Sequence, residues 1–329
     1  MDNIEYNIFT ADISGTNSTF AIINIKNLNI IYKEKHLTKK IKDISILINN
    51  FLNRSKIKNI TNAVFALAGP VNKSDRVKIT NGNIIIDKKK ILKKTKLKNI
   101  LFINDFEAVG FAINKINLKD KIIINKGKRI KNDTKAIIGA GTGLGKTILY
   151  FDKKNKYYIP IRSEGGHCDF AIKNKKEFEI YKFIKAKQKN KTFLRQQDIV
   201  SGKGIESLYQ YYKIKNFKNN KNIPNKLTAS EISNTIKTNK CSKITLDNFI
   251  KFYARCAKNI ALNSYCVSGL YLAGGIFSKN KELFNKNFIN EFIKHEEYSQ
   301  ILKNIPIIGI INYDIGLKGA AFAFKNKNA

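Results

Sequence analysis

The sequence predicts an α/β protein with two domains. Short apolar runs rich in β-branched residues alternate with segments whose apolar residues recur at helical spacing, which is typical of α/β folds. Three of the apolar runs lead into turns that contain glycine, near the start, the middle and the end of the chain. At 329 residues, the chain is also long enough for two domains.

The composition indicates a soluble protein. Hydrophobic residues make up 43% of the chain, but no apolar run approaches the roughly 18 residues of a membrane span. The start of the chain lacks the layout of a signal peptide, so we expect a cytoplasmic protein without a membrane partner. The four cysteines are scattered and form no C-x-x-C pair, which disfavours disulfides and a structural zinc site.

The formal net charge of +36 raises the question of nucleic-acid binding, because basic patches contact phosphates. However, the lysines are spread over the whole chain among many asparagines and isoleucines, as an AT-biased genome would encode at tolerant surface positions. No arginine-rich or aromatic-interleaved segment stands out. We therefore expect no specific nucleic-acid partner. Non-specific binding through lysines is kept as a rival, and it would weaken steeply with salt.

The chain opens with a strand, a polar turn and a second strand, over 6–12 and 19–25, and a third strand is expected near 28–32. The turn begins with Asp12, which could simply bond its own backbone. Alternatively, its carboxylate could hold Mg²⁺ through water while the next residues of the turn face a phosphate.

The following segments complete a first α/β domain. Apolar residues at helical spacing over 39–52 predict a helix that covers the sheet. A buried strand is expected over 63–67, and a turn at 80–82 precedes a further strand over 84–86. Four or five strands with helices between them define an α/β domain.

A strand over 100–103 delivers Asn104 and Asp105 at its carboxyl end, directly before a helical stretch over 106–113. Ligands of open α/β sheets bind outside the carboxyl ends of strands. Asp105 could merely cap the helix. In the functional interpretation it is a general base that takes a proton from an attacking hydroxyl, and Asn104 positions the substrate.

Four glycines at alternate positions, from 139 to 145, interrupt the central apolar run. Because glycine has no side chain and tolerates φ > 0, backbone N–H groups of such a loop can approach a phosphate. The segment 140–147 nearly matches the P-loop pattern, but a P-loop must open a helix. The β-branched and aromatic residues over 146–152 predict a strand instead. We therefore expect a β-hairpin whose tip holds phosphate.

The second half of the chain is mostly helical. Helices are expected over 177–187, 205–212, 228–236 and 246–261. A buried strand over 269–272 runs into the third glycine turn, with Gly274 and Gly275. This turn could merely connect a strand to a helix, or it could let the backbone approach an adenine ring. A strand over 307–311 and a helix over 316–324 follow.

The turn Glu164-Gly165-Gly166-His167 combines an acid and an imidazole around paired glycines. A single histidine is commonly structural. Nevertheless, adjacent sugar hydroxyls need both donors and acceptors, so this turn suits a polyhydroxylated ligand.

Together these motifs resemble the bacterial glucokinases of the hexokinase and actin-like ATPase superfamily. The similar segments are collinear and cover nearly the whole chain: DISGTN (12–17), ALAGPV (66–71), TNGN (80–83), INDFEAV (103–109), GAGTGLG (139–145), EGGHCDFA (164–171), SGKGIESLY (201–209), LAGGI (272–276) and DIGLKGAA (314–321).

The resemblance implies a two-domain actin-like ATPase (ribonuclease H-like) fold with an interdomain cleft. Residues 1–115 would form a small α/β domain, completed by the C-terminal helix at about 312–329, and 116–311 would form a large one. The implied activity is ATP-dependent, Mg²⁺-dependent phosphorylation of glucose at its 6-hydroxyl, the first step of glycolysis. A homodimer is the family expectation.

The resemblance also implies roles for individual residues. Asp105 would be the base that deprotonates the sugar 6-hydroxyl, and Asp12 would hold Mg²⁺ through water. The sugar would be bound by Asn104, Asp105, Glu164, His167 and Gln197. ATP and its phosphates would be bound by Asp12, Gly15, Thr16, Gly141, Thr142, Gly143, Gly274 and Gly275.

Two positions depart from the family pattern. Ser14 replaces the first glycine of D-x-G-G-T-N, which would cost about 1 kcal/mol if that position required φ > 0. Gln197 stands where the family has a glutamate at the anomeric end of the sugar. Loss of a charge-assisted hydrogen bond could remove roughly 1.5–3 kcal/mol of sugar binding. These changes keep open an alternative: a sugar-binding protein of the same fold that is non-catalytic or altered in specificity.

Overall fold

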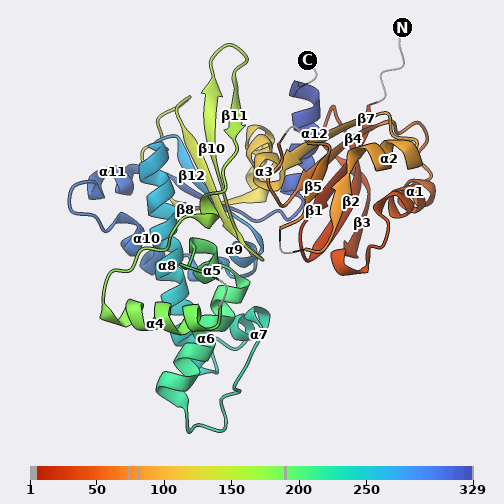
Figure 1. Cartoon of the computed structure of the whole chain (residues 1–329). Coiled ribbons are helices and arrows are strands. Elements are labelled where there is room, and N and C mark those ends of the chain that lie inside the picture. Colours follow the sequence, from red (N-terminus) through yellow and green to blue (C-terminus); the bar gives the residue numbers. More distant parts are fainter. Residues whose placement is uncertain (1–5, 73, 81, 189–190, 328–329) are drawn as a thin grey trace. The chain divides into compact units, whose positions relative to one another are not determined.

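The computed structural model describes residues 6–72, 74–80, 82–188 and 191–327. They fold into two compact units (Figure 1). Unit 1 takes in the described residues up to Asn117, the segment Phe151–Arg162 and those from Tyr313 onward. Unit 2 consists of Leu118–Tyr150 and the described part of Ser163–Asn312. The α/β class expected from the sequence is confirmed.

Unit 1 is built on a five-stranded sheet in the order β3-β2-β1-β4-β7. Its strands are β1 (Asn7–Ile13), β2 (Asn17–Asn24), β3 (Ile30–Leu37), β4 (Asn62–Leu67) and β7 (Asn99–Asn104). β1 pairs antiparallel with β2 and parallel with β4, which is in turn parallel with β7. The carboxyl ends of β1, β4 and β7 therefore lie along the same edge of the sheet, the edge at which α/β proteins bind ligands.

One face of this sheet is covered by α1 (Ile44–Ser55) and α2 (Lys88–Lys94), together with the hairpin of β5 (Arg76–Lys78) and β6 (Ile85–Asp87). An aromatic cluster fills the space between them. The ring of Phe9 packs at 5.2 to 5.7 Å against the rings of Phe20, Phe51 and Phe65. These fully buried rings fix the strands against α1.

The other face is covered by α3 (Asp105–Ala112) and α12 (Ile315–Lys327). The two helices approach so closely that a Cβ on Gly319 would lie 1.8 Å from the carbonyl oxygen of Ala108. Strand β11 (Tyr157–Ile161) also belongs to this unit, and the backbone of Tyr158 exchanges hydrogen bonds with the Asn114 side chain at 2.7 and 2.9 Å. This packing fixes the start of α3, where Asp105 lies.

Unit 2 contains the strands β10-β9-β12-β13-β8 in this spatial order. Their bounds are β8 (Lys121–Asn125), β9 (Lys135–Ala140), β10 (Leu144–Asp152, of which the last two residues are counted with unit 1), β12 (Gly269–Ala273) and β13 (Ile307–Ile310). β9 and β10 form an antiparallel hairpin in which Gly139 is paired with Gly145. The hairpin expected around the central glycines is confirmed, and so is the exclusion of a P-loop helix after them.

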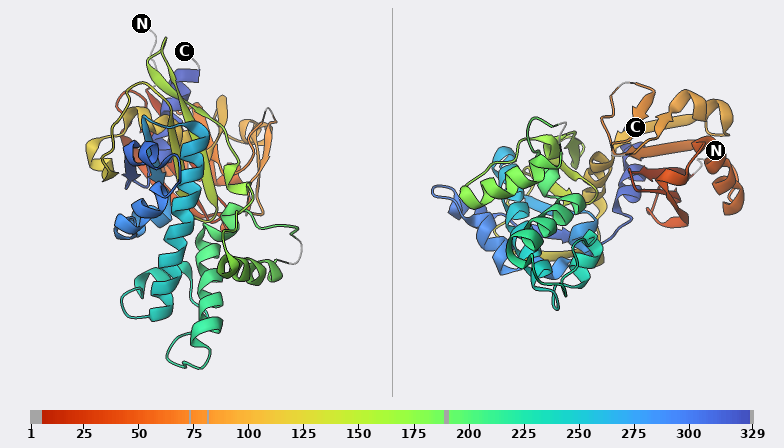
Figure 2. Two further views of the ribbon diagram at one scale, coloured as in Figure 1. Left: turned by 90° about the vertical axis from the view of Figure 1, so that its left-hand side faces the viewer. Right: turned by 60° about the horizontal axis from the view of Figure 1, so that its bottom comes forward.

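The helices of unit 2 are α4 (Lys175–Ala186), α5 (Gln196–Ile199), α6 (Gly202–Phe217), α7 (Ala229–Asn234), α8 (Lys240–Ser264), α9 (Gly275–Lys279), α10 (Lys286–Ile293) and α11 (Ser299–Asn304). α8 runs alongside α6 (Figure 2). Its buried Tyr253 donates a hydrogen bond to the carbonyl of Ile138 in β9 at 3.3 Å, which ties this helix to the sheet. Among the described residues, no helix has the length and apolar character needed to cross a membrane.

Some boundaries differ from those expected. The helix expected over 39–52 begins only at Ile44, because Asp43 caps it by accepting a hydrogen bond from the Ser45 N–H at 2.9 Å. The short strands β5, β8 and β11 and the short helices α2, α5, α10 and α11 were not predicted, since so few residues carry little periodic signal. The turn expected at 80–82 includes Asn81, which lies outside the described residues.

Glu34 on β3 makes the stability of unit 1 depend on pH. Arg54 donates two hydrogen bonds to its carboxylate, at 2.8 and 2.6 Å, and the Tyr32 hydroxyl donates another at 2.6 Å. The Arg54 hydrogen bonds, opposed by partial burial, lower the pKa of Glu34 to about 2. Because folding depresses this pKa, the stabilisation is present above about pH 5 and is lost as the pH falls toward 2.

We predict that E34Q lowers the unfolding free energy by roughly 1–2 kcal/mol at about pH 7, after allowance for solvent screening, and that the gap from the parent narrows as the pH falls below about 4. Urea unfolding of both proteins across this range measures the gap. A gap that stays constant with pH would contradict the assignment.

Candidate active site

The turn between β1 and β2 is closed by Ser14. The Ser14 N–H and hydroxyl both donate to the carbonyl of Asn17, each at 2.9 Å. From outside the turn, the Thr38 hydroxyl donates to the Ser14 carbonyl at 2.8 Å, and the Thr38 N–H donates to the Thr16 carbonyl at 3.0 Å. Gly15 and Thr16 are thus carried on a turn that is fixed at both ends.

The strain that a positive φ would cause at Ser14 does not arise. Ser14 does not adopt a positive φ, so a side chain is compatible with the backbone here. The hydroxyl instead supplies a hydrogen bond that glycine could not make. This departure from the family pattern is therefore accommodated by the local structure.

We predict that S14G destabilises the protein by about 1 kcal/mol, because glycine removes the hydroxyl bond and adds freedom to the unfolded chain. Urea unfolding measures the change. S14A separates the two causes, since it removes the hydroxyl but keeps the backbone restriction. A gain in stability for S14G would show that the serine is strained after all.

Asp12 lies near the end of β1 and is half-buried. A Cβ on Gly316 of α12 would come within 3.3 Å of its carboxylate oxygen, so glycine leaves room for the carboxylate there. Burial, together with the carboxylate of Asp314, raises the pKa of Asp12 to about 6. A cation beside this carboxylate would favour its charged form, so the acid and its surroundings fit the Mg²⁺ expected here.

Asn104, and not Asp105, is the N-cap of α3. The Asn104 side-chain oxygen accepts from the N–H groups of Phe106 and Glu107 at 2.9 and 3.3 Å, and the Glu107 carboxylate accepts from the Asn104 N–H at 3.3 Å. The Asn104 amide nitrogen donates to the carbonyl of Gly69, after β4, at 3.2 Å. The N-cap expected as one alternative for Asp105 is therefore Asn104, and Asp105 occupies the first helical position, where it is half-buried and its carboxylate also accepts from the Phe106 N–H at 2.9 Å.

The tip of the β9–β10 hairpin is a tight turn. The Gly141 N–H donates to the carbonyl of Gly143 at 2.9 Å, and the Gly141 carbonyl accepts from the N–H of Gly202, at the start of α6, at 2.9 Å. A Cβ on Gly141 would meet no atom within 4 Å. Thr142 is exposed, and none of the four glycines of this hairpin has positive φ. At Gly141 the glycine therefore leaves open space beside the backbone and is not needed for φ > 0, as the sequence had suggested.

The third glycine turn does require glycine. Gly274 has a φ of 88°, and a Cβ there would lie 2.6 Å from the carbonyl oxygen of Ala140 at the end of β9. Gly275, the next residue, has open space around it. The close approach of Gly274 to Ala140 puts the second and third glycine turns side by side within unit 2.

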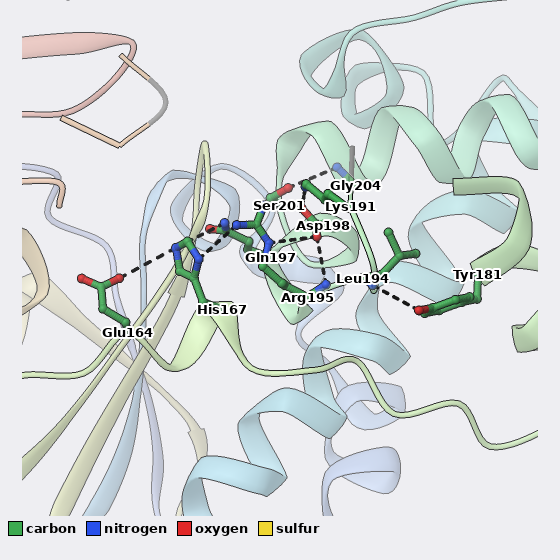
Figure 3. A network of polar contacts seen from close by, with 10 residues as sticks. All are labelled: Glu164, His167, Tyr181, Lys191, Leu194, Arg195, Gln197, Asp198, Ser201 and Gly204. Atoms are coloured by element: carbon green, nitrogen blue, oxygen red, sulfur yellow. Dashed lines mark hydrogen bonds and ion pairs between the residues drawn. The ribbon is translucent and has the colours of Figure 1, made fainter. Parts of the chain in front are cut away.

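The predicted sugar-binding residues of unit 2 come together around His167 (Figure 3). The Gln197 amide nitrogen lies 3.3 Å from Nε2 of this histidine, and a carboxylate oxygen of Glu164 lies 3.8 Å from the same atom. Gly166 allows this loop to rest on β10, because a Cβ there would lie 1.9 Å from the carbonyl oxygen of Leu144. Gln197, the departure singled out from the sequence, therefore belongs to this cluster.

Two basic residues beneath this cluster were not predicted from the sequence. Lys146 is buried, and its ammonium donates to the side-chain oxygen of Gln196. Burial, only partly offset by Cys256 and Cys168, lowers the pKa of Lys146. Arg195 contacts His167 directly, with 3.1 Å between Nη1 and Nδ1. Lys146 stands at the lysine of the near P-loop pattern, which was rejected, and Arg195 belongs to no recognisable motif, so only the folded structure reveals the positions of these two residues.

The chain has two α/β units, and their strand ends carry acids, a histidine cluster and glycine turns. This combination is typical of a sugar kinase with the fold of the actin-like ATPases. A family model for glucokinase matches residues 9–327, and the chain belongs to the glucokinase family. It is similar to the glucokinase of a Nostoc species, with 31% identity over 95% of this chain and 97% of the relative.

Solved structures agree on the fold. The chain resembles a Balamuthia mandrillaris glucokinase in complex with glucose at a TM-score of 0.82, with 19% identity over 97% of this chain and 94% of that one. A ROK family glucokinase from Streptomyces griseus in complex with glucose and AMPPNP gives a TM-score of 0.69, with 15% identity over 96% and 98%.

Proposed function

We propose that the chain is a kinase that transfers the γ-phosphoryl group of ATP to the 6-hydroxyl of glucose. Membership of the glucokinase family supports this activity. The observation in the fold that carries it is the first turn of α3, where the Asn104 cap holds Asp105 at the carboxyl end of β7. A half-buried carboxylate in this position suits a general base.

In the proposed reaction, Asp105 accepts the proton of the sugar 6-hydroxyl as its oxygen attacks the γ-phosphorus. The bond from that phosphorus to the β–γ bridging oxygen breaks, and ADP leaves. Backbone N–H groups at Gly15, Thr16, Thr142 and Gly143 would bind the phosphates and stabilise the charge on their oxygens, while Gly141, whose N–H closes the turn, would leave room for them. Gly274 and Gly275 would lie against the adenosine.

As the family resemblance implies, the sugar would be bound by Glu164, His167, Gln197, Asn104 and Asp105. This set offers donors and acceptors, as adjacent hydroxyls require. Asn104 already uses its amide in the helix cap and toward Gly69, so its main contribution would be to position Asp105.

Asp12 would hold Mg²⁺ through water. When bound, Mg²⁺ neutralises phosphate charge and orients the γ-phosphate. The raised pKa of Asp12 supports this assignment, because a nearby cation relieves the cost of a buried charge.

The partners in this proposal are glucose and ATP, in the cytoplasm. We further propose a homodimer, no specific nucleic-acid partner, and two domains close to the predicted boundaries, 1–115 with about 312–329, and 116–311, except that the segment Phe151–Arg162 is counted with the first domain, as in unit 1. The rival of a non-catalytic sugar-binding protein differs from this proposal in a single observable, the turnover of ATP.

We predict that D105N abolishes glucose phosphorylation, by at least about a thousandfold in kcat, while glucose binding stays within a fewfold of the parent. The amide keeps the size and the acceptor of the carboxylate but cannot take the proton. Glucose 6-phosphate formation measures the first quantity, and calorimetric titration with glucose measures the second. Turnover that survives in D105N would refute the role of Asp105 as base.

We predict that Q197E lowers the KM for glucose about tenfold and leaves kcat within a fewfold, because a carboxylate makes stronger hydrogen bonds than an amide. A coupled assay of ADP release over a panel of hexoses measures both constants. Q300E, a Gln-to-Glu change at an exposed position of α11, is the matched control and should leave the KM unchanged. If Q197E matches the parent with every hexose, Gln197 does not contact the sugar.

A further inference from the structure

The guanidinium of Arg195 is held rigidly. Its Nε and Nη2 each donate to the Asp198 carboxylate at 3.1 Å, in a fork that fixes the plane of the group. Asp198 is itself anchored: it is buried, and it accepts from the Arg195 N–H at 2.9 Å and from the Lys191 ammonium at 2.5 Å. Burial opposes the shift, but these hydrogen bonds from Arg195 and Lys191 lower the pKa of Asp198, so it stays charged.

Backbone hydrogen bonds bring this arginine to the histidine loop. The Gln196 N–H donates to the Cys168 carbonyl at 2.8 Å, and the Phe170 N–H donates to the Leu194 carbonyl at 3.0 Å. Arg195 itself forms an antiparallel bridge with Asp169. With two of its nitrogens committed to Asp198, the guanidinium directs Nη1 at Nδ1 of His167 (Figure 3).

The chemistry of arginine decides which nitrogen of His167 carries the proton. A guanidinium only donates, so Nδ1 of His167 must accept, and the proton of the neutral ring is therefore on Nε2. The same logic orients Gln197. Two N–H groups cannot bond to each other across the 3.3 Å to Nε2, so the amide turns and Oε1 accepts from the histidine.

We infer that Arg195 is a positioning residue for sugar binding: it locks His167 in the tautomer that presents an N–H at Nε2. This inference rests on the proposed function, in which His167 contacts a sugar hydroxyl. In the locked ring, Nε2 can only donate, so the hydroxyl that meets it must accept. The neutral ring has one N–H, so Gln197 accepts it when no sugar is bound, and a sugar hydroxyl would replace Gln197 as its acceptor.

The test combines ring ¹⁵N spectra with kinetics. Long-range ¹H–¹⁵N correlation of histidine-labelled protein at about pH 8, where an ordinary histidine is neutral, reports which ring nitrogen is protonated. H167N identifies the signals of His167. We expect the parent protein to show an unprotonated Nδ1 and a protonated Nε2. R195M should show mixed tautomers and a KM for glucose raised about tenfold, with the KM for ATP and kcat within a fewfold.

Two further variants separate positioning from general damage. D198N keeps the arginine but weakens the fork, so it should change the tautomer signals in the same direction. Y181F removes a hydroxyl that accepts from the N–H of Leu194 at 3.2 Å, one residue before the arginine, and should change neither the spectrum nor the kinetics.

A proton on Nδ1 in the parent protein would overturn the inference, even if the protein phosphorylates glucose. Mixed tautomers in R195M with an unchanged KM for glucose would overturn the positioning role. Absence of glucose phosphorylation by the parent would instead refute the proposed function, whereas the tautomer would still be read from the spectrum.

Discussion

The side chain of Asn104 is the constraint on which the chemistry of unit 1 depends. Asn104 is the last residue of β7. Its side-chain oxygen caps α3, and its side-chain nitrogen donates to the carbonyl of Gly69, after the neighbouring strand. These contacts leave Asp105 in the first turn of the helix, whose N-terminal dipole favours a negative charge. The acid is therefore oriented by a hydrogen-bonded cap and not by its own contacts alone. Loss of the cap would release both the helix start and the loop at Gly69.

Unit 2 relies on close backbone approach for the same purpose. Gly274 and Gly166 each occupy positions where a Cβ would overlap the carbonyl oxygen of Ala140 or Leu144. These two contacts fix the third glycine turn and the histidine loop on the ends of β9 and β10. The buried ammonium of Lys146 and the fork between Arg195 and Asp198 lie beneath these turns. Apolar side chains at these positions would cost less free energy to bury than charged ones. Such polar groups are retained where orientation matters more than stability.

The sequence predicted most of the strands, the longer helices and the hairpin that excludes a P-loop, because these depend on periodicity and on glycine placement. It also selected Gln197, which the fold brings to His167. It could not reveal that Ser14 is unstrained, since φ is set by the turn and its hydrogen bonds. Nor could it reveal Arg195, because a single arginine has no pattern until the chain brings Asp198 and His167 around it. Features that depend on neighbouring residues could be predicted from the sequence, whereas side-chain networks between distant segments could be recognised only in the tertiary structure.

The central claim is that this chain moves phosphate from ATP to the 6-hydroxyl of glucose. The most direct test compares ADP release by the parent protein, with Mg²⁺ and ATP, in the presence of glucose and of 6-deoxyglucose. The account predicts ADP release with glucose, none above background with 6-deoxyglucose, and competition between the two sugars. Equal ADP release with both sugars, or none with glucose from a folded protein, would contradict it.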